Sequence, residues 1–541
     1  MSAFDRDDAR VRLGAEDFDV LVIGGGVTGA GVALDAASRG LRTAIVERDD
    51  WASGTSSKSS KLVHGGLRYL QQKEYRLVYE NLAERQRLLD NAPHLVHPLP
   101  FLIPLFGKDG VVNAAVAKAY TTALWLYDLT GGLRIRHRHR RMPKAEALRH
   151  VPSLRDDRLV AAFLYYDART DDARLTLAVV RTAAIDYGAV AANHLGAVAL
   201  RKDATGRVAG AELADGTGVR ARAVVNAAGV WSDDVRALDE RTHPDSLRPA
   251  KGIHVTVPAH RLPCDIAAVL PVPKDHRSVF VVPWGDRTYI GTTDTDYEGP
   301  LDDPECTPQD VAYLLDAVNS ATTSGLTTAD VIGSWAGLRP LVKGASTART
   351  ADLSRRHQVS VGASGLVTVT GGKLTTYREM AADTVDAVVR LLGGGGRSRT
   401  RHLPLRGAVG LEQLRGPDAG ALLGVAPDLC AHLVDRYGAE ATRVLRLANG
   451  DASLLEPLVP GLEYLRVEAV WAVRREMACT LDDILARRTR ALLRDRDATA
   501  AAAPAVAELV APLLGWSPEE SRAEVDRFVA LAARERASVG A

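Results

Sequence analysis

The stretch from Phe18 to Gly29 reads FDVLVIGGGVTG, and it decides the fold of the N-terminal part of the chain. Its first six residues, Phe18 to Ile23, form a short apolar run that is typical of a buried parallel strand. The run leads directly into the spacing Gly24-x-Gly26-x-x-Gly29. In this pattern the first glycine permits a tight turn, the second lets a pyrophosphate approach the backbone, and the third lets helix and strand pack closely. The stretch therefore predicts a dinucleotide site.

The residues that follow support the same interpretation. A helix is expected from Val27 to Ser38, with Thr28 in its first turn, and its N-terminus offers free N–H groups to phosphate. A second strand, Arg42 to Val46, is expected to end at Glu47, whose carboxylate can accept hydrogen bonds from an adenosine ribose. An acid at this place disfavours a 2′-phosphate and hence NADP, but it does not separate NAD from FAD.

A segment rich in serine and threonine favours a flavin. Residues 51–70 read WASGTSSKSSKLVHGGLRYL, and such a loop of small hydroxyl side chains can wrap an extended cofactor by hydrogen bonds. A solvated surface loop is the alternative interpretation. The residues of this loop that we expect at the cofactor are Ser57, Ser59, Ser60, His64, Gly65, Gly66 and Leu67.

Two later turns are expected to reach the same cofactor. A strand from Ala223 to Ala227 meets Gly229, so the backbone can pass close to the ligand. A strand that ends at Gly371 is followed by a helix near Leu374, whose N-terminus would face the flavin ring. The cofactor contacts expected from these turns are Gly229, Trp231, Gly372, Leu374 and Thr375.

Composition bounds the class of protein. The chain has 541 residues, of which 46% are hydrophobic and 25% charged, as in soluble proteins of two or three domains. Lys plus Arg is 68 against 67 for Asp plus Glu, so a nucleic-acid partner is not expected. The 4 cysteines are far apart and fit reduced thiols in the cytoplasm. No metal motif is found, and we expect no signal peptide and a chain that is soluble or at most peripheral on a membrane.

The segment Ser56 to Leu70 (SSKSSKLVHGGLRYL) resembles the FAD-dependent glycerol-3-phosphate dehydrogenase family, the aerobic, membrane-associated and quinone-linked kind. The C-terminal run Arg474 to Leu493 is similar to the helical tail of that family, and Val230 departs from a proline that the family usually has. Further matches are Asp167 to Leu175 (DARTDDARL), Asn226 to Trp231 (NAAGVW), Lys251 to His254 (KGIH), Gly291 to Asp294 (GTTD), Gly337 to Leu341 (GLRPL) and Thr370 to Arg378 (TGGKLTTYR).

With this resemblance, three regions are expected. The first is an α/β FAD-binding domain, Rossmann-like and of the glutathione-reductase type, made of residues 17–90, 172–236 and 345–392. The second is a mostly antiparallel β cap domain of residues 91–171 and 237–344, which would hold the substrate. The third is a C-terminal helical domain of residues 401–541. Asp171 and Asp172 are interpreted as an ordinary helix N-cap.

The resemblance implies oxidation of sn-glycerol 3-phosphate to dihydroxyacetone phosphate, with a hydride passing from C2 to flavin N5 and electrons going to a membrane quinone. Such a substrate needs fixed cations for its phosphate and a base for its hydroxyl proton. We expect His254 as the base, with His64 as the rival, and assign catalytic roles also to Arg339 and Lys373. The residues expected at the substrate are Arg68, Tyr69, His254, Arg339, Arg349 and Lys373.

An apolar segment beside a basic one indicates a membrane surface. Val111 to Tyr127 is apolar with aromatic residues, and Leu133 to Met142 (LRIRHRHRRM) is strongly basic. This combination predicts peripheral binding to anionic lipid at the inner face of the cytoplasmic membrane. A buried cap helix and a solvated basic strand are the alternatives.

Other functions stay open at this point. A glycerol-3-phosphate oxidase would use the same pocket with oxygen as the acceptor, and an FAD-dependent amino-acid oxidase or dehydrogenase would share the fold. A flavin-binding protein without catalysis, or a tRNA-modifying one, is the alternative from another class. The sequence also leaves open whether the chain forms a homodimer through its helical tail or packs that tail on the cap.

Overall fold

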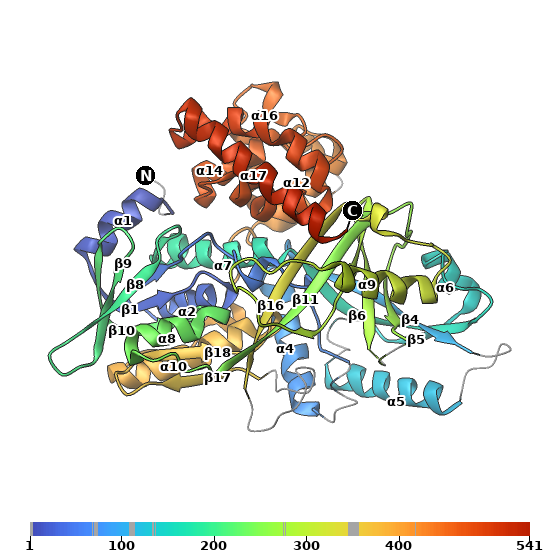
Figure 1. The fold of residues 1–541 in the computed structure, drawn as a ribbon, viewed down its shortest axis with the longest axis horizontal. Coiled ribbons are helices and arrows are strands. Elements are labelled where there is room, and N and C mark those ends of the chain that lie inside the picture. Colours follow the sequence, from blue (N-terminus) through green and yellow to red (C-terminus); the bar gives the residue numbers. More distant parts are fainter. Residues whose placement is uncertain are drawn as a thin grey trace.

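The computed structural model describes most of the chain, in two sheets and a helical C-terminal part (Figure 1). Two predicted substrate residues, Arg68 and Arg349, lie outside the described residues. The described residues are 4–67, 69, 74–107, 114–131 (backbone alone for 114–117), 135, 137–273, 275, 277–343, 356–416 and 418–540.

The first sheet is built on five parallel strands. Their order is β18 (Val367–Thr370), β10 (Gly218–Asn226), β1 (Asp17–Ile23), β2 (Thr43–Val46) and β7 (Val190–Ala192). The antiparallel strands β17 (Gln358–Val361), β8 (Ala197–Lys202) and β9 (Val208–Leu213) extend it. All four residues of β2 are buried, as an apolar run in a parallel sheet should be. The predicted α/β domain with a parallel sheet is confirmed.

Helices cover this sheet, and the glycine turn lies at the carboxyl end of β1, where α2 begins. α2 (Val27–Ser38) follows β1 and packs between α7 (Asp172–Tyr187) and α10 (Tyr377–Leu392). α1 (Arg6–Ala15) and α8 (Ser232–Glu240) pack on the opposite face of the sheet, in a core that contains Leu13, Leu21 and Val235. A 3₁₀ turn, Leu374–Thr376, precedes α10, so the helix proper begins three residues later than the expected start at Leu374.

Among the described residues the second sheet has ten strands, and it is antiparallel except where β12 (Ala267–Pro271) pairs with β4 (Val96–Phe106). It confirms the predicted, mostly antiparallel cap. β3 (Leu62–Val63) lies within residues 17–90, which were expected in the FAD-binding domain, yet it pairs with β6 (Leu159–Thr170) and thus belongs to this second sheet. The main path of the sheet is β15 (Thr295–Asp296), β11 (Leu247–Pro258), β14 (Arg287–Gly291), β13 (Ser278–Trp284), β12 (Ala267–Pro271), β4 (Val96–Phe106), β6 (Leu159–Thr170) and β3 (Leu62–Val63), with β16 (Gly333–Val342) beside β11 and β5 (Arg140–Pro143) beside β6.

Helices also flank the second sheet. α4 (Tyr75–Asn91) and α5 (Ala114–Thr130) lie together below it in Figure 1, with α5 at the lower edge of the molecule. α6 (Lys144–His150) and α9 (Pro308–Ala321) lie on its other side. The two sheets thus stand side by side, with β11 and β16 next to the first sheet (Figure 1).

The C-terminal part is helical, as predicted, and covers the junction of the two sheets (Figure 1). Among the described residues, α16 (Arg496–Leu514) is the one helix whose length and apolar composition would allow it to cross a membrane. Its buried side chains, among them Val506 and Val510, pack in a core shared with α17. That packing accounts for the apolar residues on its buried face. The helices are α11 (Ala419–Leu423), α12 (Pro427–Tyr437), α13 (Ala441–Arg446), α14 (Arg466–Glu476), α15 (Ala491–Arg494), α16 (Arg496–Leu514) and α17 (Pro518–Ser538), with a π-helical turn at Asp483–Arg488.

Candidate active site

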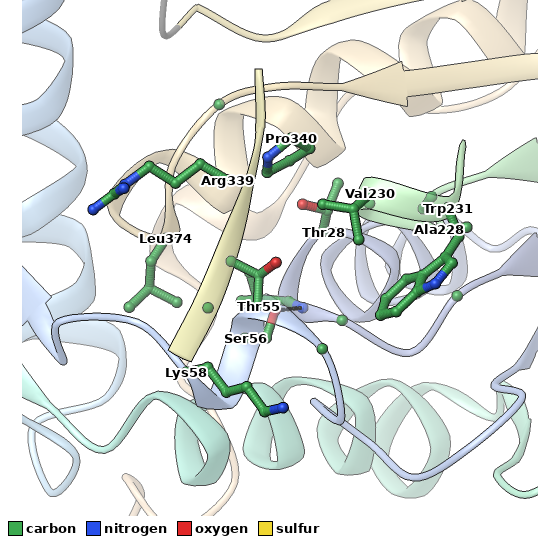
Figure 2. Close-up of a pocket in the computed structure, with 18 of the residues that line it drawn as sticks. Thr28, Thr55, Ser56, Lys58, Ala228, Val230, Trp231, Arg339, Pro340 and Leu374 are labelled. Carbon is green, nitrogen blue, oxygen red and sulfur yellow. Dashed lines mark hydrogen bonds between the residues drawn. The ribbon is translucent and has the colours of Figure 1, made fainter. Parts of the chain in front are cut away.

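A cavity of about 480 Å³ lies where the two sheets meet. Its walls come from the carboxyl ends of β1, β2 and β10, from the serine-rich loop, and from β11 and β16 of the second sheet. Ligands of open α/β sheets bind at the carboxyl ends of the strands, next to a change in strand order. In Figure 2 Trp231 and Arg339 lie on opposite sides of Thr55 and Ser56, which come from the serine-rich loop.

The glycine turn shapes one end of the cavity. Gly24 has φ +113°, and a Cβ atom there would lie 2.6 Å from the carbonyl oxygen of Ala227. Gly26 caps α2 and lines the cavity together with Thr28, whereas Gly29 faces the Gly24 carbonyl and lets helix and strand pack. The predicted cofactor contact at Gly29 is therefore a packing position. The N-terminus of α2 is left facing the cavity, as an anion site requires.

Glu47 lies beside this turn and lines the cavity. Its carboxylate accepts hydrogen bonds from the backbone N–H groups of Gly25 (2.5 Å) and Asp49 (2.9 Å). Burial raises its pKa, and these two N–H groups oppose the shift. Trp231 lies across from it with Arg48 5.1 Å from the centre of its ring, and its buried Nε1 has no hydrogen-bond partner in the described part of the chain.

The serine-rich loop lines the middle of the cavity, but not with all the residues that were predicted. Ser59, Ser60 and His64 line it. Ser57 does not: its hydroxyl donates to the Gly54 carbonyl within the 3₁₀ turn Thr55–Ser57 and is buried away from the cavity. Sequence reasoning missed Ser56, whose Oγ accepts from the N–H of Val27 at 2.9 Å, and also Ser53, Thr55 and Lys58. No spacing in the sequence separates Ser56 from Ser57, because the 3₁₀ turn that turns them to different sides covers three residues only.

Gly65, Gly66 and Leu67 were also predicted to contact the cofactor, and they do not line the cavity. The Gly65 N–H donates to the hydroxyl of Tyr127 (2.9 Å) and to Asp167 (3.1 Å). A Cβ atom on Gly65 would overlap Tyr127, so only glycine fits this position. The double glycine therefore shapes the backbone that brings His64 and Tyr69 to the cavity.

His254, on β11, lines the opposite wall. Its Nε2 lies 2.8 Å from the Ser60 hydroxyl, and its ring stacks on Trp335 with centroids 4.8 Å apart. Its Nδ1 is buried and has no partner among the described residues. Burial, followed by the charges of Lys61 and Arg339, holds the pKa of His254 well below its usual value. The imidazole is therefore neutral near pH 7.

Arg339 and Lys373 supply the cations. Arg339, on β16, donates from Nη1 to Asp294 (3.1 Å) and from Nη2 to the Thr292 hydroxyl (3.2 Å). Lys373 places its Nζ 3.9 Å from the centre of the Tyr69 ring. Both cations and Tyr69 line the cavity. Of the residues predicted at the substrate, the four that lie in the described part of the chain are brought together here.

The remaining predicted cofactor residues, Gly229, Gly372, Leu374 and Thr375, also line the cavity. The donor set suits a dinucleotide: a helix N-terminus for phosphate, Glu47 for a ribose diol, and small hydroxyl side chains between them. The buried Nε1 of Trp231 and Nδ1 of His254 are polar atoms that a bound ligand can satisfy.

A separate cluster, outside the cavity, offers metal-ligating atoms within the described residues. His194, Cys479 and Asp483 place one ligand atom each within 4.8 Å of one another. These atoms are already in use, since His194 Nε2 and Arg487 both bind Asp483, at 2.9 Å and 2.6 Å. Burial raises the pKa of the Cys479 thiol to about 12, which disfavours a thiolate. The cluster is a hydrogen-bonded contact between the first sheet and the C-terminal part.

Two family models match the chain, one over the two sheets and one over the helical C-terminal part. Residues 19–378 match the family model of FAD-dependent oxidoreductases, and residues 398–521 match the model described as the C-terminal domain of alpha-glycerophosphate oxidase. The chain is 45% identical over 529 residues to glycerol-3-phosphate dehydrogenase 2 of Mycobacterium tuberculosis, covering 96% of this chain and 88% of that protein. It is 38% identical to the mitochondrial glycerol-3-phosphate dehydrogenase of Mus musculus, over 94% of this chain and 72% of that protein.

Two solved structures extend the comparison. The glycerol-3-phosphate dehydrogenase from Bacillus halodurans, complexed with FAD, matches 99% of this chain and 98% of its own, with 32% identity and a TM-score of 0.79. The L-alpha-glycerophosphate oxidase from Mycoplasma pneumoniae matches 72% of this chain and 99% of its own, with 19% identity and a TM-score of 0.55, and shares the fold alone.

Proposed function

The chain belongs to the FAD-dependent glycerol-3-phosphate dehydrogenase family, and from that premise we propose that it oxidises sn-glycerol 3-phosphate to dihydroxyacetone phosphate and passes the electrons to a membrane quinone. FAD is the cofactor, and when bound in this cavity it would supply, at N5, the acceptor for a hydride from C2 of the substrate. One observation carries the proposal: the dinucleotide end of the cavity opens to a wall that holds Arg339, Lys373 and a neutral histidine.

The proposed binding of the substrate follows from charge. A phosphate dianion in a partly dry site needs cations of fixed geometry. Arg339 is held by Asp294 and Thr292, so its fork is oriented before the substrate arrives. Lys373, which also lines the cavity, adds a point charge next to Tyr69. This pair favours a phosphorylated substrate over an amino acid, whose carboxylate carries one charge.

The proposed proton acceptor is His254. A neutral imidazole can take the proton of the C2 hydroxyl as the hydride leaves. Its low pKa means that it holds this proton weakly, and Ser60, 2.8 Å from Nε2, is the hydroxyl placed to share it. Trp335 keeps the ring in one orientation by stacking on it.

The decisive experiment is anaerobic bleaching of the flavin spectrum. Glycerol 3-phosphate should bleach the purified yellow protein, and glycerol at the same concentration should not. Bleaching by both would remove phosphate recognition from the proposal. Bleaching by neither, or bleaching by amino acids instead, would overturn the reaction itself.

The electron acceptor of the reduced flavin has two candidates, a quinone and oxygen, because the C-terminal region matches the family model of an oxidase domain. An assay with oxygen alone, and then with a soluble quinone analogue, separates them. A quinone-linked enzyme should form little hydrogen peroxide in air and turn over rapidly with the quinone. Rapid, stoichiometric peroxide formation would favour the oxidase.

Helix α5 supports the proposal that the protein binds a membrane surface. Its inner face buries Leu124 and Tyr127, while Trp125 and Leu129 are 49% and 69% exposed. α5 lies at the lower edge of the molecule in Figure 1, far from the C-terminal helices. The exposed arginines 138, 140 and 141 follow it in the chain. An exposed aromatic and aliphatic face with basic residues close by fits an anionic lipid surface at the inner face of the cytoplasmic membrane.

We therefore expect salt-sensitive binding to vesicles that contain anionic lipid. The double variant Arg138→Gln with Arg141→Gln should weaken binding by about tenfold or more in low salt, since each such charge contributes about 1 kcal/mol near the surface. Co-sedimentation with vesicles measures it. The matched control, Arg443→Gln with Arg446→Gln, removes two exposed arginines from α13 and should leave binding unchanged. No binding to anionic vesicles at low salt, or equal loss in the control, would contradict the proposal.

A further inference from the structure

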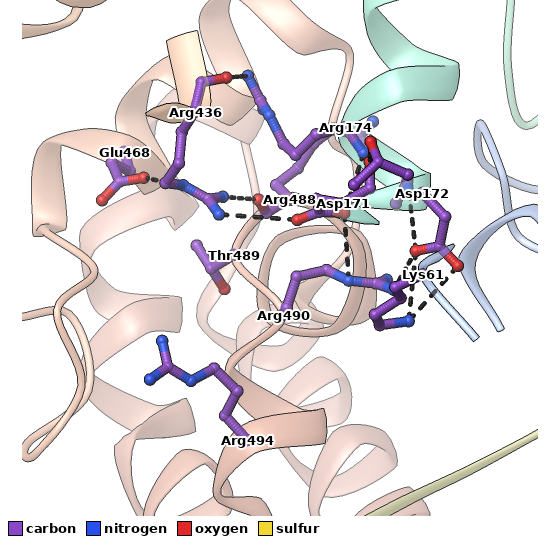
Figure 3. Close-up of polar contacts among 12 residues, drawn as sticks. Lys61, Asp171, Asp172, Arg174, Arg436, Glu468, Arg488, Thr489, Arg490 and Arg494 are labelled. Carbon is purple, nitrogen blue, oxygen red and sulfur yellow. Dashed lines mark hydrogen bonds and ion pairs between the residues drawn. The ribbon is translucent and has the colours of Figure 1, made fainter. Parts of the chain in front are cut away.

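Buried arginines of the C-terminal part reach the cofactor loop. They come from the segment that joins α14 to α16, around the π-helical turn Asp483–Arg488. Arg488 binds both carboxylate oxygens of Asp50, at 2.6 and 2.8 Å, and Asp50 lies at the start of the loop. Arg490 reaches Ser57 in the middle of the same loop, and Figure 3 shows its side chain directed toward Lys61 and Asp172.

Arg490 is the link between two segments that meet at the cavity. Its Nη2 donates to the carbonyl oxygen of Ser57 at 2.5 Å and to Asp172 at 2.7 Å. The residue is 1% exposed, and it adopts a left-handed backbone with φ +68°, a conformation that is unfavourable for arginine. A buried charge on a disfavoured backbone persists where its contacts hold it in place.

Asp172 shares its carboxylate between Arg490 and the loop. Its Oδ2 accepts from the N–H of Ser59 at 3.0 Å and from the Ser59 hydroxyl at 2.6 Å. Lys61 lies 3.3 Å from Oδ1 and also donates to the Ser57 carbonyl. Asp172 was predicted to be an ordinary helix-capping residue; the capping bond, to the N–H of Arg174, is made by Asp171. Asp172 instead orients the loop.

The chain neighbours of Ser57 and Ser59 line the cavity, so the bonds that hold these two serines also fix the cavity wall. Ser56 binds the N–H of Val27 at the N-terminus of α2, which is the phosphate end. The Ser60 hydroxyl bonds to His254 at the substrate end of the cavity. The Tyr289 hydroxyl donates to the carbonyl oxygen of Ser60 at 2.9 Å. Within residues 56–60, Arg490 and Asp172 hold Ser57 and Ser59, and the residues that line the cavity are Ser56, Lys58, Ser59 and Ser60. Because these residues are neighbours in the chain, a shift of Ser57 or Ser59 would displace the residues that line the cavity.

We propose that Arg490 is a positioning residue: together with Asp172 it holds the loop 55–60 in the conformation that binds FAD. The C-terminal helical part is therefore required for tight cofactor binding as well as for packing. The proposal rests on the proposed function only in taking this cavity as the FAD site, and it requires no particular substrate.

Arg494 offers a matched control from the same segment. It is as buried as Arg490, with 1% exposure for each, and Figure 3 shows its side chain directed away from Lys61 and Asp172. Its bonds reach the cap sheet and the helical part instead, at Asp286 (2.8 Å), the Trp284 carbonyl (3.3 Å) and Glu463. Loss of Arg494 should weaken domain packing without touching the loop.

The test compares the FAD affinity of Arg490→Met with that of Arg494→Met. Each holoprotein is purified and stripped of FAD, and the quenching of FAD fluorescence is titrated without substrate. We expect the Kd for FAD to rise about tenfold or more in R490M, because charged hydrogen bonds to the loop are lost. R494M should bind FAD within about twofold of the unchanged protein, even if its Tm falls. Equal FAD affinity in both variants would overturn the proposal.

Two further variants separate the loss of the loop contact from a general loss of folding. R490M leaves a buried carboxylate short of one cation, so the double variant R490M/D172N removes both charges together. It should show the same loss of FAD affinity. Arg490→Lys keeps the charge but reaches fewer acceptors, and it should restore part of the affinity and the visible circular dichroism of the bound flavin. Full affinity in R490M/D172N would overturn the proposal. Failure of glycerol 3-phosphate to bleach the flavin would leave these binding results unaffected.

Discussion

Flavin reduction by glycerol 3-phosphate is expected to slow by about 100-fold or more when His254 is replaced by alanine, while the protein stays yellow. Among the residues that the structure describes, His254 bonds to the loop at Ser60 alone, and the rest of the loop that holds the cofactor is anchored at Val27, Asp172 and Arg490. Removal of the imidazole therefore takes away the proton acceptor and spares FAD. Anaerobic stopped-flow spectroscopy measures the rate.

The matched control for this prediction is His64→Ala, which removes the rival histidine from the same cavity. Retention of the rate in H254A together with its loss in H64A would move the base to His64.

The pH dependence of flavin reduction gives a second test of His254. The pKa of His254 lies well below 6.5, so the imidazole stays neutral as pH falls from about 8 to 6 and the reduction rate should stay level. An acid limb centred near 6.5 would contradict the assignment.

Replacement of Arg339 by methionine is expected to lower kcat/KM for glycerol 3-phosphate by about 100- to 1000-fold. Its guanidinium is oriented by Asp294 and Thr292 and is the proposed fork for the phosphate. R339K should recover only part of the loss, because an ammonium cannot make the bidentate contact. Steady-state kinetics with a soluble electron acceptor measure both variants.

Loss of Arg339 also leaves the Asp294 carboxylate, which is 9% exposed, without this partner. The double variant R339M/D294N removes that charge, and it should be as defective as R339M while folding normally. Asp294→Asn alone keeps the cation and should cost far less. An unchanged KM in R339M, with bound flavin intact, would exclude Arg339 from phosphate recognition.

The dinucleotide end of the site could be predicted almost completely. Gly24, Gly26 and Glu47 lie where the motif predicts, because a strand, a tight turn and a helix start are set by neighbouring residues. The prediction of the residues on the cap side depended on the family resemblance, because His254 and Arg339 lie on two strands that pair only in the folded sheet. Their meeting could not be read from spacing.

The serine loop shows where local reasoning stops. Ser56 and Ser57 are adjacent and identical, yet Ser56 lines the cavity and Ser57 is buried against the other side. The rotation of one 3₁₀ turn decides between them, and that rotation is set by Asp172 and Arg490 rather than by the serines. Composition predicts a hydroxyl-rich loop but not which hydroxyl groups face the ligand.

By itself, the sequence determined the family, the dinucleotide cradle and the residue types of the substrate wall, because glycine spacing, apolar runs and motif order are properties of short stretches. Only the tertiary structure decided how the chain holds its cofactor loop. Arg490 reaches the Ser57 carbonyl across 433 residues of sequence, and Asp172 reaches Ser59 across 113. Such contacts exist only once separate domains pack, since their geometry depends on backbone positions that no local pattern encodes.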